Sequence, residues 1–259
     1  MKQRLDVVLA ARGMVASRSQ AESYVRLGQV KVNGRVATKS GQMVADTDEL
    51  TVTADEQYVG RAALKLASVA EAFRLDFRDK TVLDVGSSTG GFTEYALRHG
   101  ARKVIAVEVG TNQLHPRLRG NPQIELHEQT DIRNFTTEEK IDMVVADVSF
   151  ISLRELLPHI SELITPASEL VMMVKPQFEV YAEHGHPSTG STSSRQASSG
   201  FHTKVLNKGV IKNDKMRRDI LKDFEAWAQQ RFRIIDKADS QVAGSKGNLE
   251  RFYLLRKTN

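Results

Sequence analysis

The stretch Val82–Phe92, VLDVGSSTGGF, decides the fold class of this chain. It begins as a short apolar strand with Asp84 near its end and continues into a turn that contains Gly86, Gly90 and Gly91. Glycines allow the backbone to turn sharply and to lie close to a ligand. Open parallel sheets bind ligands at the carboxyl ends of their strands. Because an apolar helix pattern follows, the stretch predicts a cradle for a nucleotide-type cofactor; an ordinary tight turn between strand and helix is the alternative.

The turn differs from two common nucleotide-binding motifs. The phosphate loop GxxxxGK[ST] requires Lys and Ser or Thr where this chain has Thr93 and Glu94. The dinucleotide motif GxGxxG is absent because Ser87 and Ser88 follow Gly86. The pattern DxGxxxGGF instead resembles motif I of class I S-adenosylmethionine (SAM)-dependent methyltransferases. This resemblance implies a Rossmann-like, doubly wound α/β sheet and a SAM site that includes Asp84, Gly86, Ser88, Gly90, Gly91 and Phe92.

Three further acidic residues follow predicted strands. Glu108 ends the apolar segment that begins at Lys103, and it lies 17 positions after Gly91, about the spacing at which an acidic residue meets a ribose in doubly wound folds. Asp131 and Asp147 follow the next two apolar segments. Each residue alone is more often a helix cap or a turn residue. The regular series favours a ligand crevice, so we add Glu108, Asp131 and Asp147 to the expected SAM site.

Length and composition limit the class of protein. The 259 residues, 40% of them hydrophobic, suffice for one large or two modest domains with a real core. The absence of cysteine excludes disulfides and zinc–thiolate sites. His184 and His186 lack the context of metal ligands, so we expect no metal. No apolar run is long enough for a membrane span, and the N-terminal one is too short for a secretory signal. We therefore expect a soluble cytoplasmic protein, whose oligomeric state stays open.

Positive charge is concentrated at the N-terminus. Residues 1–40 hold eight Lys or Arg against two Asp or Glu, a net +6, whereas the whole chain carries +5. Two short amphipathic helix patterns, 4–13 and 17–28, each end in glycine. A hairpin pattern around Asn33 and Gly34 follows, with Leu50–Val52 as a closing strand. Such a basic region suggests contact with a polyanion; a merely solvated basic face is the alternative.

This N-terminal region resembles the small alpha-L RNA-binding motif shared by a small-subunit ribosomal protein, tyrosyl-tRNA synthetases and pseudouridine synthases. The matching residues are Arg4, Leu5, Asp6, Ser17, Arg18, Ala21, Gly28, Val30, Val32, Asn33 and Gly34. The resemblance implies that Arg4, Arg18 and Lys31 face structured RNA and contact its backbone and shape more than its base sequence.

We therefore divide the chain into an RNA-binding domain (1–56), a linker (57–60) and a methyltransferase domain (61–259). Because the linker is short, we expect Tyr58 and Val59 to pack at the junction and to transmit RNA docking to the cofactor site.

The chemistry of the available side chains limits which RNA atom is methylated. Methylation at pyrimidine C5 usually requires a thiolate, and this chain has no cysteine. The sequence DVSF at 147–150 lacks the Asn/Asp-Pro-Pro-aromatic turn that is typical of amino-group methylation, which leaves that reaction unsupported but not excluded. A ribose 2′-hydroxyl needs a positioned base to take its proton.

Lys65, in a helix pattern, and Lys175, at the end of an apolar strand, occupy suggestive places. Burial favours a neutral amine and Asp147 favours a charged one, so the sequence leaves open whether Lys175 acts as a base or as a cationic stabiliser. For either lysine alone, an exposed surface side chain is the alternative.

Nearly the whole chain resembles the TlyA proteins, a family known both as haemolysins and as FtsJ-like ribosomal RNA 2′-O-methyltransferases. The resemblance rests on YVGRAALKL, LDVGSSTGGFT, ADVSFISL, VKPQFE and GNLERF. It implies a catalytic tetrad of Lys65, Asp147, Lys175 and Glu250, in which Lys175 is the base and the others orient it and the ribose. The implied substrate is a cytidine of ribosomal RNA or of a ribosomal subunit. A nonenzymatic RNA-binding module and a membrane-active haemolysin are the alternative functions.

The C-terminal third departs from the family pattern in one segment. The Ser- and Gly-rich residues 187–200 have the composition of a flexible loop. A helix is expected over Lys215–Phe232, and strands over Arg233–Asp236 and Phe252–Leu255. A second basic patch, or else a solvated helix start, is indicated by Lys204, Lys208, Lys212, Lys215, Arg217 and Arg218.

Overall fold

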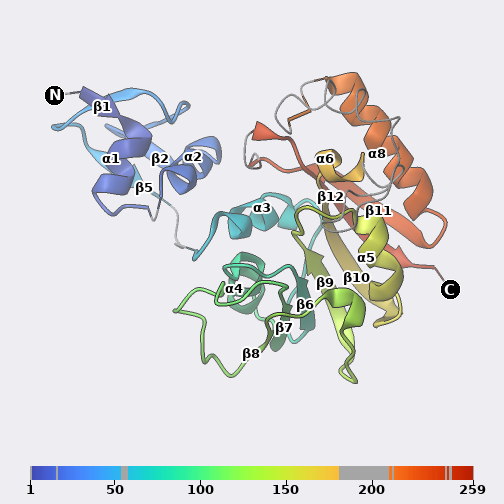
Figure 1. Ribbon diagram of the computed structural model, residues 1–259. Helices are drawn as coiled ribbons and strands as arrows, with labels where there is room; N and C mark the ends of the chain where they lie inside the picture. The colour runs from blue at the N-terminus through green and yellow to red at the C-terminus, as the bar shows by residue number, and fades with distance from the viewer. Residues whose placement is uncertain are drawn as a thin grey trace, which may run out of the picture.

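The computed structural model describes residues 2–258 except 16, 54–57, 181–209, 212, 243, 245 and 246. A small N-terminal region lies beside a larger α/β region (Figure 1), and its second helix contacts the first helix of that larger region. The predicted flexible loop at 187–200, His184 and His186 lie outside the described residues, as do Lys204, Lys208 and Lys212.

The N-terminal region contains the two predicted helices and the predicted hairpin. The helices are α1 (Leu5–Ala11) and α2 (Arg18–Arg26). The hairpin strands are β2 (Val30–Val32) and β3 (Arg35–Val36), and β5 (Leu50–Val52) pairs with β2. Asn33 and Gly34 form the turn with φ angles of 50° and 77°, as a tight two-residue hairpin requires.

A second small sheet in this region was not predicted. β1 (Lys2–Arg4) pairs with β4 (Met43–Ala45) in antiparallel register. Neither strand has a period-two pattern of its own, because three-residue strands are too short to show one.

The larger region is built on one sheet of seven strands. The strands are β6 (Thr81–Val85), β7 (Lys103–Val107), β8 (Ile124–His127), β9 (Ile141–Ala146), β10 (Ile164–Val174), β11 (Phe232–Asp239) and β12 (Arg251–Lys257). Their order across the sheet is β11-β12-β10-β9-β6-β7-β8. The five strands β6 to β10 run parallel, whereas β12 is antiparallel to both of its neighbours.

Helices cover both faces of this sheet, which explains its nearly continuous apolar strands. Alternate strand residues such as Val82 and Met143 pack with α3 (Arg61–Ala70) and α4 (Gly91–Arg98). The intervening residues, such as Leu83 and Val144, pack on the opposite face with α5 (Leu153–Ile160) and α8 (Asp214–Ala228). The doubly wound α/β architecture predicted from the sequence is therefore confirmed.

The remaining helical elements are η1 (Ile132–Asn134) and α6 (Pro176–Glu179). The sequence-based prediction placed the end of the last helix too late, because Phe232 already belongs to β11. The Phe232 ring is fully buried, and a buried apolar residue suits the end of a helix as well as the start of a strand. The hydrophobic pattern alone therefore does not locate the boundary between α8 and β11.

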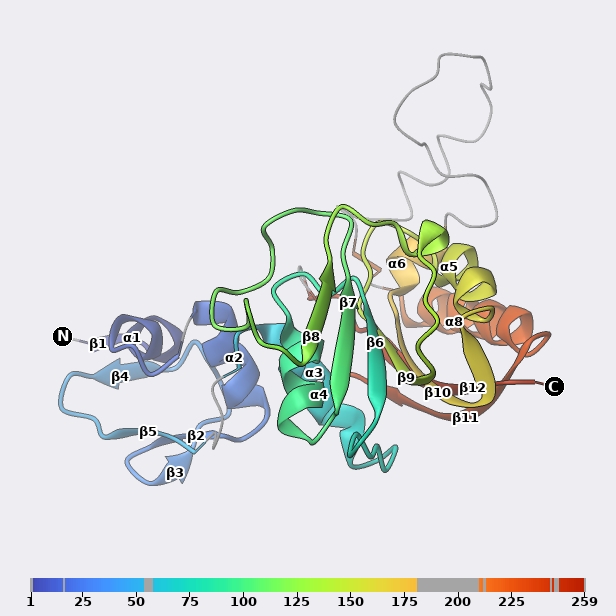
Figure 2. The same cartoon turned by 90° about the horizontal axis from the view of Figure 1, so that it is seen from below.

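The strand order creates a crevice at one position. β6 lies between β7 and β9 in the sheet. After β6 the chain adds β7 and β8 on one side of it, and then crosses to add β9 on the other side. Figure 2 shows the connections that follow β6, β7 and β9 emerging at the same edge. Open α/β sheets bind ligands at such a reversal, beyond the carboxyl ends of the strands.

The junction between the two regions is packed. Tyr58 is buried, and its carbonyl oxygen accepts a hydrogen bond of 3.1 Å from Gln20 Nε2 on α2. Its ring lies 5.8 Å from the Tyr95 ring, and the Arg98 guanidinium stacks over it. The Val59 amide donates to Glu94 on α4. The expected packing of Tyr58 and Val59 is therefore present, whereas transmission of RNA docking stays a prediction.

Candidate functional site

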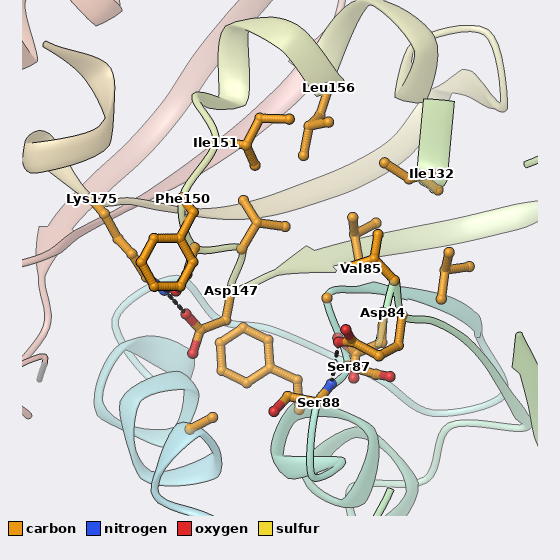
Figure 3. Close-up of a pocket in the computed structure, with 18 of the residues that line it drawn as sticks. Asp84, Val85, Ser87, Ser88, Ile132, Asp147, Phe150, Ile151, Leu156 and Lys175 are labelled. Carbon is orange, nitrogen blue, oxygen red and sulfur yellow. Dashed lines mark hydrogen bonds and ion pairs between the residues drawn. The ribbon is translucent and has the colours of Figure 1, made fainter. Parts of the chain in front are cut away.

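A cavity of about 750 Å³ opens at the carboxyl ends of β6, β7, β9 and β10. Of the residues predicted to act in the site, it is lined by Lys65, Asp84, Gly86, Ser88, Phe92, Glu108, Asp131, Asp147, Lys175 and Glu250. Gly90 and Gly91 lie at the start of α4 behind the turn. Figure 3 shows side chains from separate strand ends pointing into this one cavity.

The glycine turn has little space for side chains. Gly86 has φ +76° and Gly90 has φ +88°, which are conformations that other residues rarely adopt. A Cβ atom on Gly90 would lie 2.5 Å from Leu118 Cδ1, and a Cβ atom on Gly91 would lie 3.0 Å from the Ala63 backbone nitrogen. The glycines therefore let α4 begin directly behind the cavity and pack closely against α3.

Asp84 is a buried carboxylate with one free oxygen. Its Oδ2 accepts a hydrogen bond of 2.6 Å from Thr93 Oγ1, whereas Oδ1 has no partner in the described structure. Burial raises the pKa of Asp84 to about 7, against the opposing effect of the Thr93 hydrogen bond. Ser87 Oγ is also buried without a partner. Buried polar groups without partners are uncommon, so two of them beside one cavity indicate a polar ligand.

Two further predicted residues frame the same side of the cavity. Glu108 accepts hydrogen bonds from the Ser88 amide (2.9 Å) and the Gly110 amide (2.7 Å), which fixes its carboxylate beside the glycine turn. Asp131 pairs with Arg133, and the hydrogen bonds from that guanidinium hold the pKa of Asp131 below its usual value, against partial burial. The two carboxylates therefore follow successive strands of the sheet and line the same side of the cavity.

The predicted tetrad is assembled at the other side of the cavity. Lys175 Nζ lies 2.6 Å from Asp147 Oδ1 (Figure 3), and it donates a hydrogen bond of 2.7 Å to Ser149 Oγ. Lys65 Nζ lies 2.7 Å from Glu250 Oε2 and 3.7 Å from Asp147 Oδ2. The two lysines and two carboxylates thus form one continuous chain of ion pairs.

The elements explain how these four side chains meet. Asp147 follows β9 and Lys175 follows β10, which is its parallel neighbour, so both emerge at the same edge. Lys65 comes from α3, and Glu250 precedes the antiparallel strand β12. All four are largely buried. Since burial of a charge is costly unless it is paired, the equal number of cations and anions is what allows the cluster to exist.

Three lining residues were missed by the sequence analysis as site residues. Phe150 is 77% exposed, has φ +69° and lies beside the Phe178 ring at a centroid distance of 5.3 Å. Arg61, one helical turn before Lys65, lines the cavity without a hydrogen-bond or ion-pair partner in the described structure. Ser149 contacts Lys175 directly. Their proximity in sequence to Lys65 and Asp147 was the only available signal.

The predicted RNA-facing residues lie on the N-terminal region. Arg4 and Arg18 both donate to the buried carboxylate of Asp6, at 3.0 Å and 3.1 Å. The hydrogen bond from Arg4 lowers the pKa of Asp6, partly opposed by burial and assisted by Arg18. The two guanidinium groups remain at least half exposed, and Lys31 is half-buried on β2. Asp6 therefore orients two cations without covering them.

The predicted second basic patch is wrong for one residue. Arg217 is buried and paired with Asp239, whereas its neighbours Lys215 and Arg218 are exposed on α8. Residue 217 falls on the face of α8 that packs on the sheet, which helical periodicity places there.

Within the described ranges, no group of three or more His, Asp or Glu residues is arranged to hold a metal ion. None of the helices in the same ranges has the length and apolar character needed to traverse a bilayer.

The sheet order, the glycine turn after β6 and the cavity at the switch point define a class I methyltransferase. The fold is shared with a candidate SAM-dependent methyltransferase from Listeria monocytogenes at a TM-score of 0.51 and 15% identity, over 77% of this chain and all of that one. Residues 58–258 match the FtsJ-like methyltransferase family, and residues 3–50 match the S4 domain. The chain belongs to the TlyA family of FtsJ-like methyltransferases.

Relatives match over nearly their full length. The 23S rRNA (cytidine-2′-O)-methyltransferase TlyA of Campylobacter jejuni is 35% identical over 96% of this chain and 98% of its own. The 16S/23S rRNA (cytidine-2′-O)-methyltransferase TlyA of Mycobacterium tuberculosis is also 35% identical, over 98% of this chain and 89% of its own. A structure from Streptococcus thermophilus, described as a candidate hemolysin, has a TM-score of 0.67 and 32% identity, and covers all of this chain and 89% of its own.

Proposed function

We propose that this protein transfers a methyl group from SAM to the 2′-hydroxyl of a cytidine ribose in ribosomal RNA. The names of the TlyA relatives support the reaction and the substrate class. The observation that carries the proposal is the buried chain of ion pairs through Lys65, Asp147, Lys175 and Glu250. A binding module without catalysis would have no need to bury four charges at the edge of a ligand cavity.

The residues beside the glycine turn suit SAM. Asp84 Oδ1 and Ser87 Oγ are buried acceptors without partners, and SAM offers an ammonium and hydroxyl groups as donors. We propose that Asp84, Gly86, Ser88, Gly90, Gly91 and Phe92 hold its amino-acid part, and that Glu108, Asp131 and Asp147 contact the remainder. When bound, SAM supplies an electrophilic methyl group on a sulfonium.

Lys175 is the proposed base. As the 2′-oxygen gains the methyl group, its proton has to leave, and Lys175, which faces the cavity, accepts it after giving up its own proton. The resulting ammonium is stabilised by Asp147 at 2.6 Å, while Ser149 fixes the direction of Nζ. Lys65, held by Glu250, neutralises the other oxygen of Asp147 and orients the ribose.

Arg4, Arg18 and Lys31 are the proposed RNA contacts of the N-terminal region. Exposed cations held in fixed directions suit phosphates of folded RNA, since such contacts position a protein without reading the base sequence. The matched ranges 3–50 and 58–258 support the division into an RNA-binding domain (1–56), a linker (57–60) and a methyltransferase domain (61–259). Ribosomal RNA or ribosomal subunits are the proposed partners, and the cytoplasm is the proposed location.

Methyl transfer from labelled SAM to unmodified ribosomal subunits tests the proposal. We expect labelled methyl groups to be incorporated into at least one ribosomal subunit. Mapping of the methylated nucleotide should place the methyl group on a ribose 2′-oxygen. Transfer to a base would contradict the proposed chemistry. SAM binding without transfer to either subunit would favour a binding role.

A further inference from the structure

A buried arginine outside the proposed tetrad lies next to one of its members. Arg217, on α8, is only 9% exposed, and its side chain reaches the segment that carries Glu250. It does not line the cavity. Since a buried charge is costly unless it is fully paired, its partners are informative.

Those partners lie on both sides of Glu250 in sequence. Arg217 Nε donates a hydrogen bond of 3.1 Å to the carbonyl oxygen of Leu249, the residue before Glu250. Arg217 Nη2 lies 2.5 Å from Asp239 Oδ1. The same oxygen accepts a hydrogen bond of 2.7 Å from Nε of Arg251, the residue after Glu250. Arg217 therefore holds the chain directly before Glu250 and, through Asp239, directly after it.

The carboxylate of Glu250 has little freedom of its own. The main-chain carbonyl oxygen of Glu250 accepts a hydrogen bond of 2.9 Å from the Ser240 amide. A Cβ atom on Gly244 would lie 2.4 Å from Glu250 Oε1, so the backbone at Gly244 closely borders the carboxylate. Under these limits, a small shift of the backbone at 249–251 moves the carboxylate away from Lys65, which lies only 2.7 Å from it.

Packing of α8 does not require Arg217. The helix is held on the sheet by Leu221, Phe224 and Ala228, which are buried in the core on that face. An aliphatic side chain at 217 would fill much of the same space without pairing Asp239. The charge of Arg217 is thus available for another role.

We propose that Arg217 is a positioning residue for Glu250, acting through Leu249 and Asp239. It sets the Glu250–Lys65 contact and thereby the geometry of Lys65 at Asp147. This inference rests on the proposed function, because it assumes that Glu250 belongs to the catalytic tetrad.

The test uses the full-length chain with ribosomal subunits and labelled SAM. Arg217→Met is expected to lower kcat by about tenfold, the rate factor that corresponds to one lost charge-assisted hydrogen bond. The KM for SAM is expected to change by less than about twofold, because Arg217 touches no residue of the glycine turn. Arg217→Lys should restore part of the rate. Arg233→Met, the same charge change at an exposed position on β11, should leave kcat unchanged.

A double-mutant comparison separates positioning from general stability. In a Glu250→Gln background, Arg217→Met is expected to lower kcat by less than about twofold, since residues that act as a unit are not additive. The same tenfold loss in that background would overturn the inference. Asp239→Asn approaches the network from the other side and should reproduce the kcat loss; it provides the same comparison if Arg217→Met does not fold.

The failure of the inference differs from the failure of the proposed function. Wild-type kcat in folded Arg217→Met and Asp239→Asn, with Glu250→Gln impaired, would overturn the inference alone. Wild-type kcat in Glu250→Gln would remove Glu250 from the tetrad and overturn the inference with it.

Discussion

Replacing Lys175 by Met removes the proposed base while keeping most of the side-chain volume. Lys175 Nζ contacts Asp147 at 2.6 Å and Ser149 at 2.7 Å, and the substitution removes both contacts. A positioned acid or base typically contributes about 10²- to 10⁴-fold to a rate, so we expect kcat to fall by at least about a hundredfold. SAM affinity should change by less than about threefold, because Asp147 keeps Lys65 as a partner and the other proposed SAM contacts lie on the opposite side of the cavity.

The expected loss of stability is moderate. Breaking a buried ion pair costs about 3–5 kcal/mol when the remaining charge has no other partner. Here Asp147 keeps Lys65 at 3.7 Å, so we expect a cost of about 2 kcal/mol. For a chain of this size, that cost corresponds to a Tm lower by about 4–8 °C. The variant should therefore remain folded at assay temperature.

The assay is methyl incorporation into ribosomal subunits under single-turnover conditions, with SAM binding and Tm measured on the same preparation. Lys80→Met is the matched control: Lys80 pairs with Glu169 at 2.9 Å near the amino end of β6, away from the cavity. It loses the same charge and one ion pair, and its transfer rate should equal that of the wild type. A Lys175→Met protein that transfers methyl groups within tenfold of the wild-type rate would refute the assignment of the base.

Other features of the structure give three more predictions. Phe150→Ala should lower kcat/KM for ribosomal subunits by about tenfold, because an exposed ring beside the cavity suits stacking with an RNA base. An unchanged kcat/KM would exclude stacking, and SAM affinity, measured as the control, should stay the same. Tyr58→Ala should lower the free energy of unfolding by about 3 kcal/mol and weaken both SAM binding and methylation, because its ring packs on Tyr95 of α4, the helix that begins at Gly91; unchanged SAM affinity and methylation would exclude the proposed transmission. Since the folded pKa of Asp84 is raised to about 7, the folded state binds an extra proton between about pH 4 and 7. Stability of the ligand-free protein should therefore fall by up to about 4 kcal/mol as pH rises across this range, and Asp84→Asn should flatten that decline in chemical unfolding.

Local patterns were sufficient for most of the fold. The apolar runs before Asp84, Glu108 and Asp147 correctly predicted parallel strands, because a strand buried on both faces must be apolar throughout. The glycine turn predicted its own conformation, since φ angles of +76° and +88° leave few other choices of residue. The boundaries of the elements were predicted less accurately. Phe232 is apolar and would be buried in either a helix or a strand, so the hydrophobic pattern did not separate α8 from β11.

The candidate site was only partly predictable. Resemblance to the TlyA family named Lys65, Asp147, Lys175 and Glu250, and the strand ends suggested that Asp147 lies near Lys175, but nothing in the sequence paired Lys65 with Glu250. Phe150 escaped notice because its exposure and its positive φ depend on the course of the chain after β9. Arg217 was assigned to a basic surface because its neighbours in sequence are basic, whereas its partners are Asp239 at the end of β11 and Leu249 before β12, which lie 22 and 32 residues further along the chain.

The sequence by itself determined the class of fold, the family and the kinds of side chain available to the site. These depend on hydrophobic periodicity and on short motifs, which are properties of adjacent residues. Only the tertiary structure decided that Glu250 meets Lys65, that Asp147 lies between the two lysines and that Arg217 holds the chain around Glu250. The physical reason is that β12 enters the sheet antiparallel beside β10, so its first residue arrives at the edge where the parallel strands end.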